Sequence, residues 1–61
     1  MLRTELVRRA ASQVIRTYRG NALEFMLENE HANRERGDHA TADAWFDIAV
    51  AASELLREKR S

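Results

Sequence analysis

The 61-residue chain contains no cysteine and no proline, and it has only two glycines. Without cysteine it can form neither disulfides nor thiolate metal sites, and it has no cysteine nucleophile. The scarcity of proline and glycine removes most of the residues that mark turns and strand ends. These absences favour an all-helical chain that is interrupted only at the glycines.

Long apolar runs are also missing, and none approaches the roughly 20 residues that a membrane-spanning helix needs. The N-terminal segment lacks the continuous apolar stretch of a secretory signal, so we expect it to belong to the fold. We therefore expect a cytoplasmic protein with a single domain over residues 1–61. A chain this short buries a small core, typically worth about 3–5 kcal/mol, which a partner subunit could supplement.

The charges balance, with ten basic and ten acidic residues, but the two signs are separated along the chain. Residues 1–20 carry five arginines and one acid, whereas residues 21–47 carry seven acids and two arginines. Two interpretations are open. Either the basic segment lies against the acidic one, within a subunit or between subunits, or its arginines meet phosphate.

Apolar residues recur at spacings of three and four along three segments of the chain. This periodicity predicts amphipathic helices near residues 2–18, 22–36 and 39–59. The fold class that follows is all-α, a small three-helix domain made of a helical hairpin and an N-terminal amphipathic helix. We expect oligomerisation to complete this domain.

The two glycines and two polar residues beside them are predicted to form the helix ends. Gly20 and Gly37 should end the first and second helices, because glycine tolerates the left-handed conformation found there. The side-chain oxygens of Asn21 and Asp38 should then cap the helices that follow, with Glu24 completing a capping-box-like arrangement after Asn21.

The third predicted helix has the clearest apolar stripe. Alanines that alternate with one large aromatic residue allow a neighbouring helix to approach closely while the indole fills the remaining space. We expect Trp45 to be mostly buried. The stripe is Ala42, Trp45, Ala49, Ala52 and Leu56, widened by Phe46, Ile48 and Leu55.

The start of the second predicted helix is apolar around more than half of its circumference. Phe25, Met26 and Leu27 follow one another at about 100° steps, so one facing pair of helices cannot easily cover all three. An exposed patch of this kind is unusual on a soluble monomer. We therefore predict a protein interface at these three residues, with a symmetric dimer favoured and a larger protein partner as the other possibility.

The polar stretch over residues 31–43 holds both histidines. His39 and Asp43 have the i, i+4 spacing of two metal ligands, and His31 and Glu35 would have to complete the four that a structural zinc needs. The alternative is a set of solvated polar residues beside a turn. We expect the latter, with no metal and no cofactor.

No residue pattern in the chain predicts catalysis. Ser12 and Ser53 have no histidine at a recognisable spacing, and no glycine-rich loop is available to hold a phosphate. Carboxylates at helix-face spacing are typical of a solvated surface, and the chain is too short to enclose a substrate pocket. We expect a non-enzymatic protein.

Two resemblances accompany these features. The stretch "GDHATADAWFDIA" resembles the second half of a tetratricopeptide unit at Gly37, Ala42, Phe46 and Ala49, which implies a close-packed helical hairpin. Over a longer region, the chain is similar to a group of short uncharacterised alphaproteobacterial proteins with a tyrosine–glycine turn, a "GD" turn and a "W..I" helix. That similarity implies a bacterial, cytosolic, non-enzymatic domain. It is carried by Val14, Ile15, Tyr18, Gly20, Ala22, Gly37, Asp38, Trp45, Ile48 and Leu56.

The leading functional hypothesis is a small protein–protein interaction module that self-associates or docks on a larger protein. The second is a nucleic-acid-binding regulator or phage-type accessory, which would use a basic face of the first helix formed by Arg8, Arg9, Arg16 and Arg19. The acidic third helix argues against the second hypothesis, because its carboxylates would meet phosphate. A third, weaker possibility is that the first helix lies on a membrane surface.

Overall fold

The structure, a computed structural model, describes the backbone of residues 2–60 and the side chains of residues 4–58. Along the chain follow helix α1 (Leu2–Tyr18), a short 3-10 helix η1 (Arg19–Asn21), helix α2 (Ala22–Glu35) and helix α3 (His39–Arg60). Residues 2–60 contain no strand, which confirms the all-α prediction. The helix bounds agree with the predicted ones to within one residue.

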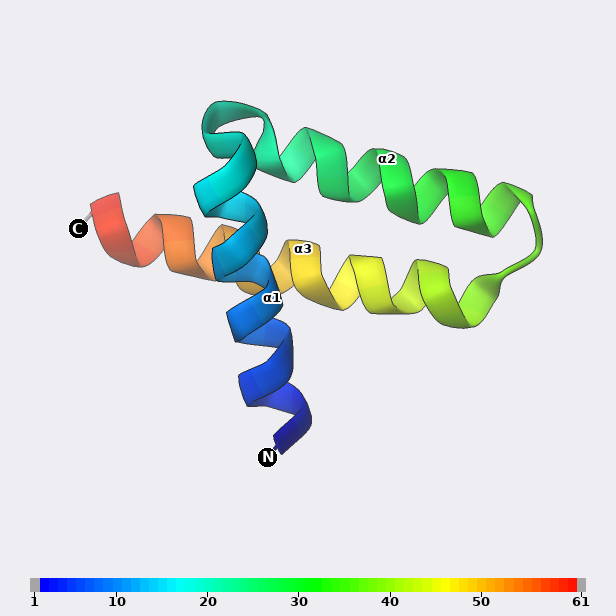
Figure 1. The fold of residues 1–61 in the computed structure, drawn as a ribbon, viewed down its shortest axis with the longest axis horizontal. Helices are drawn as coiled ribbons and strands as arrows, with labels where there is room; N and C mark the ends of the chain where they lie inside the picture. The colour runs from blue at the N-terminus through cyan, green and yellow to red at the C-terminus, as the bar shows by residue number, and fades with distance from the viewer. Residues whose placement is uncertain (1, 61) are drawn as a thin grey trace.

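Helices α2 and α3 lie side by side and antiparallel, as a hairpin (Figure 1). Helix α1 crosses α3 at a steep angle, and its N-terminal half extends beyond α3 on the side away from α2. The Cα atoms span 37 × 28 × 17 Å, so the molecule is a flat body in which α1 covers only part of the hairpin.

The core consists almost entirely of small side chains, which allows the helices to approach closely. Met26 is the largest of the fully buried side chains in the described part of the chain. Branched residues such as Val14 and Ile48 pack against the core but remain partly exposed. The predicted stripe of α3 is buried at its alanines, whereas Trp45 and Leu56 keep part of their surface exposed because α1 does not run along the hairpin. The buried core residues are Ala11, Ala22, Met26, Ala42, Ala49, Ala51 and Ala52.

The connection from α1 to α2 differs from the predicted one. The left-handed residue is Arg19, with φ of 51°, and Gly20 does not adopt a positive φ. Tyr18 stacks on Phe25 of α2, with ring centroids 4.0 Å apart, so the last residue of α1 is held in place and the chain reverses at the next residue. The prediction that Gly20 provides the left-handed end of the helix is therefore wrong by one position.

The predicted cap at Asn21 is also wrong. Its side chain makes no capping hydrogen bond, and its φ of −99° and ψ of 8° differ from the extended backbone usual at such a position. The reason is the intervening 3-10 turn, which runs directly into α2 and whose Arg19 carbonyl already accepts the Ala22 N–H.

The connection from α2 to α3 has the predicted form. Gly37 has φ of 86°, and the N–H groups of Gly37 and Asp38 donate to the carbonyls of Arg34 and Asn33, at 3.0 and 2.9 Å. This pair of bonds is the Schellman arrangement that satisfies the last carbonyls of a helix. Asp38 then caps α3, because its carboxylate accepts the Thr41 N–H at 3.2 Å. Hydrogen bonds from Thr41 lower the pKa of Asp38.

Candidate interaction surface

Helix α3 carries two large apolar side chains that the rest of the chain leaves open to solvent. Phe46 is 52% exposed and Val50 is 43% exposed. They are four residues apart, so they lie one above the other on the same side of the helix. Val50 borders an open pocket beside the N-terminal part of α1 but keeps much of its surface exposed, whereas adjacent helices bury the alanine stripe.

The register between α2 and α3 brings a third apolar side chain, Leu27, to the same side of the hairpin. Arg34 of α2 contacts Asp43 of α3, with 3.0 Å between Nη2 and Oδ1. Leu27 lies seven residues before Arg34, and Val50 lies seven residues after Asp43. Because the helices are antiparallel and seven residues make two turns, Leu27 and Val50 lie at the same level and on the same side as the ion pair.

We refer to Leu27, Phe46 and Val50 as the apolar face. Leu27 is 48% exposed, similar to the two residues from α3. Exposed apolar side chains gathered on one side of a helix pair are typical of a surface that another protein covers.

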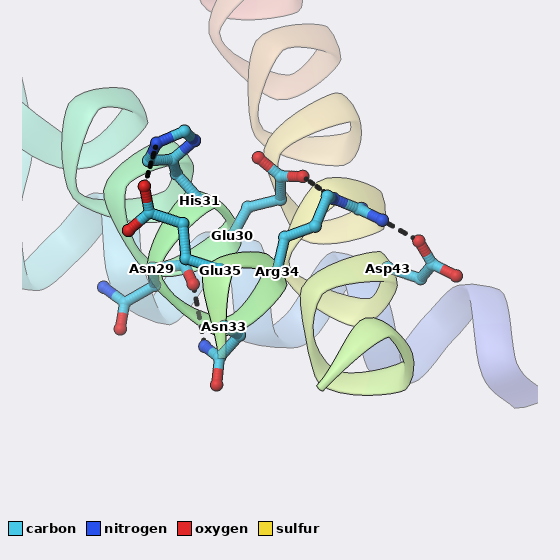
Figure 2. Close-up of polar contacts among 7 residues, drawn as sticks. All are labelled: Asn29, Glu30, His31, Asn33, Arg34, Glu35 and Asp43. Carbon is cyan, nitrogen blue, oxygen red and sulfur yellow. Dashed lines mark hydrogen bonds and ion pairs between the residues drawn. The ribbon is translucent and has the colours of Figure 1, made fainter. Parts of the chain in front are cut away.

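A polar cluster joins α2 and α3 at the end of the hairpin nearest the α2–α3 turn (Figure 2). The Arg34 guanidinium lies between two carboxylates, 2.6 Å from Glu30 and 3.0 Å from Asp43. These hydrogen bonds raise the pKa of Arg34 further above its usual range. The contacts are exposed, so each ion pair contributes modestly to stability, and their main effect is to hold α2 in register with α3.

The residues predicted as an interface lie in three different surroundings. Met26 is completely buried in the core, so as a surface residue it is a wrong prediction. Phe25 lies between the rings of Tyr18 and Trp45, and of the predicted residues Leu27 is the one that is widely exposed. Contacts with both α1 and α3 therefore cover more of α2 than the sequence analysis expected.

The basic residues of α1 do not form one uninterrupted solvent face. Arg8 is half-buried and ion-pairs with Glu58 of α3, with 3.6 Å between the charged atoms. The carboxylate in this contact therefore belongs to α3. One interpretation of the sequence instead placed the basic first helix against the acidic second helix. Arg9, Arg16 and Arg19 are exposed.

An open groove of about 680 Å³ runs between the C-terminal parts of α1 and α3 and the start of α2. Ile15, Leu23 and Leu55 contribute apolar surface to the groove. Two of the arginines from the predicted basic face, Arg16 and Arg19, lie at its rim together with Glu58.

The two histidines lie apart from these surfaces. His31 is exposed on α2, with its Nε2 3.2 Å from Glu35, and His39 is the first residue of α3. Among residues 4–58, no three side chains of the histidine and carboxylate types lie close enough together to hold a metal ion. In the same part of the chain, no helix has the length and apolar character required to cross a membrane.

Sequence reasoning missed the position of Phe46 and Val50. It favoured the core over an interface for Phe46, at the edge of the buried stripe, and gave Val50 no role. The signal that could have found this surface is the seven-residue spacing of Asp43, Val50 and Arg57, which defines a second strip of α3 beside the alanine stripe. The burial of Asn33 was also unexpected, because most of the residues around it are polar and exposed. Its side-chain amide donates to the backbone carbonyl of Asn29 at 2.7 Å.

Comparison of the chain with protein-family models, curated proteins and solved structures finds no match in any of the three. The resemblances to a tetratricopeptide half-unit and to short alphaproteobacterial proteins therefore stay predictions.

Proposed function

We propose that this chain is a small, non-enzymatic protein–protein interaction module, a three-helix domain that self-associates through the apolar face. The observation that carries the proposal is the exposure of Leu27, Phe46 and Val50 on one side of the α2–α3 hairpin. Burial of apolar surface is the main driving force of such association. We further propose that the module works in the bacterial cytoplasm, which agrees with the absence of cysteine.

The composition of the core supports self-association. Six of the seven buried hydrophobic residues are alanines, each of which buries little apolar area. A second copy that covered the apolar face would bury two aliphatic side chains and one aromatic ring from each chain. That gain would stabilise the fold as well as the complex.

The experiment is thermal unfolding over a wide range of protein concentrations. We expect the midpoint to rise with concentration, because association stabilises the folded state by mass action. The double variant Phe46→Ser/Val50→Ser should lose this dependence. Leu6→Ser is the matched control, because Leu6 is 62% exposed on α1 and should leave the dependence intact.

The same experiment separates the competing functions. A midpoint that is independent of concentration in the unchanged chain would refute self-association and favour docking on a larger protein. A midpoint that rises only when DNA or RNA is added would favour the nucleic-acid hypothesis. The ion pair between Arg8 and Glu58 weighs against that hypothesis, because it removes one of the four arginines from the basic face.

A further inference from the structure

One strip of α3 has opposite charges at its two ends and an apolar residue at its centre. Asp43, Val50 and Arg57 are spaced by seven residues, so they lie on the same side of the helix. Two turns separate each from the next, which places Asp43 and Arg57 about 10.5 Å on either side of Val50. All three side chains are exposed.

We propose that two copies of the chain pack face to face with their α3 helices antiparallel, about a two-fold axis at the level of Val50. This inference rests on the proposed self-association and specifies its geometry. The axis places Asp43 of each copy opposite Arg57 of the second copy, because the two residues are equally far from Val50. The same contact is therefore made twice, as in any two-fold interface.

Helix α2 fits the same axis. Leu27 lies at the level of Val50, as the Arg34–Asp43 contact shows, so each Leu27 also meets its equivalent in the second copy. The apolar face then forms the centre of the interface, with charged pairs at both ends of α3. An apolar centre with a charged rim is the usual anatomy of a protein interface.

Phe46 also has space in this arrangement. The two-fold axis brings Phe46 to within one residue's rise of Ser53 of the second copy, since both lie about one turn from Val50. Serine is small, and the Ser53 hydroxyl already donates to the Val50 carbonyl at 2.9 Å. Its polar group is therefore satisfied within its own chain when the aromatic ring covers it.

Other acidic residues of α3 do not oppose the arrangement. Asp47 and Glu54 border a pocket beside Thr4 and Arg8 of α1, and Val50 borders the same pocket. The axis places these two acids at the levels of Ser53 and Phe46 of the second copy, so neither faces another acid. Parallel α3 helices, in contrast, would place the Asp43 side chains against one another and the Arg57 side chains against one another. Like charges at such positions disfavour a parallel pair.

Charge exchange tests the geometry directly. Asp43→Arg and Arg57→Asp should each weaken self-association on the order of tenfold or more, because each creates two like-charge contacts in the dimer. An equimolar mixture of the two variants should recover association, since in a mixed dimer position 43 of each copy again faces the opposite charge at position 57 of the other. The double variant Asp43→Arg/Arg57→Asp should recover it as well. Sedimentation velocity of each sample provides the dissociation constants.

Two variants with the same changes of charge serve as controls. Glu28→Arg lies on the solvent side of α2 and Arg9→Asp on the solvent side of α1, so both should leave the dissociation constant unchanged. Asp43→Arg also removes the contact with Arg34 in its own chain. Weakening by each single variant together with recovery in the double variant is therefore the diagnostic result, because a parallel pair keeps like charges opposite one another in all three. Far-ultraviolet circular dichroism verifies that each variant is folded.

The outcomes distinguish the geometry from the proposed function. If the unchanged chain associates but the double variant does not recover association, the antiparallel arrangement is overturned and self-association stands. If the unchanged chain is a monomer at every concentration, both proposals fail.

Discussion

Phe25 packs edge-on against Trp45, with the ring centroids 5.6 Å apart and the ring planes at 82°. On its other side, Phe25 stacks on Tyr18, with the planes only 16° apart. The three rings come from α2, α3 and α1, so one row of aromatic contacts joins all three helices. In a core made mostly of alanines, this row supplies much of the large apolar surface that packs between the helices.

Replacement of Trp45 by alanine should therefore destabilise the fold strongly. We expect a loss of about 3 kcal/mol, at the lower end of the range for large aromatic residues because the indole is only partly buried. Tyr18→Phe keeps the stacked ring and should leave stability nearly unchanged. Thermal unfolding followed by circular dichroism measures both, and a Trp45→Ala variant with an unchanged midpoint would contradict the role given to this row of rings.

The two glycines should respond in opposite ways to substitution by alanine. Gly37→Ala should cost about 1 kcal/mol, because φ is +86° there although the space around the position is open. Gly20→Ala should be neutral or slightly stabilising, because Gly20 has no positive φ and nothing lies within 4 Å of an added Cβ. Denaturant unfolding of the two variants provides the comparison, and equal losses would show that the turns are wrongly assigned.

Arg19→Gly should stabilise the chain, because Arg19 holds the left-handed conformation that costs an ordinary residue free energy. We expect a gain of a few tenths to about 1 kcal/mol, reduced by the greater backbone freedom of glycine in the unfolded state. The same denaturant titration measures it. A loss of stability of similar size would place the left-handed residue elsewhere.

Asp38 should make stability depend on pH in the acidic range. Its pKa is lowered from 3.8 in the folded state, mainly by hydrogen bonds from Thr41, so the folded state favours the ionised carboxylate. The resulting stabilisation is fully present above pH 3.8 and is lost as the pH falls through the lower folded-state pKa. The Asp38→Asn variant keeps a capping oxygen but has no carboxyl group to titrate at this position. The melting midpoints of the variant and of the unchanged chain should therefore approach each other as the pH is lowered.

The alanine core should tolerate enlargement poorly. Ala52 has no exposed surface, so Ala52→Leu should cost about 1–3 kcal/mol by forcing the helices apart. Ala44 is exposed on the same helix, and Ala44→Leu should change stability little. If both substitutions had the same small effect, the helices would not be in the close contact that the burial of the alanines implies.

The sequence predicted the helices well because their signals are local. Apolar spacing located α1, α2 and α3, and the pair Gly37 and Asp38 predicted both the end of α2 and the cap of α3. These features depend on neighbouring residues only, so no knowledge of the tertiary arrangement was needed.

The errors arose where tertiary packing decides the outcome. Tyr18 stacks on Phe25 and the left-handed residue is Arg19 in place of Gly20, while Met26 is buried in the core and Phe46 is left exposed. Helical periodicity reports which residues share a side, but the direction in which a neighbouring helix crosses decides which side is covered. Of the three residues predicted as an interface, Leu27 is the one that the structure leaves widely exposed.

Sedimentation equilibrium at micromolar concentrations, with and without high salt, tests self-association most directly. We predict a mass that rises with concentration toward twice 7.0 kDa at low salt. High salt should weaken association by screening the Asp43–Arg57 contacts while the apolar face remains. A mass of 7.0 kDa at every concentration and under both conditions would contradict self-association.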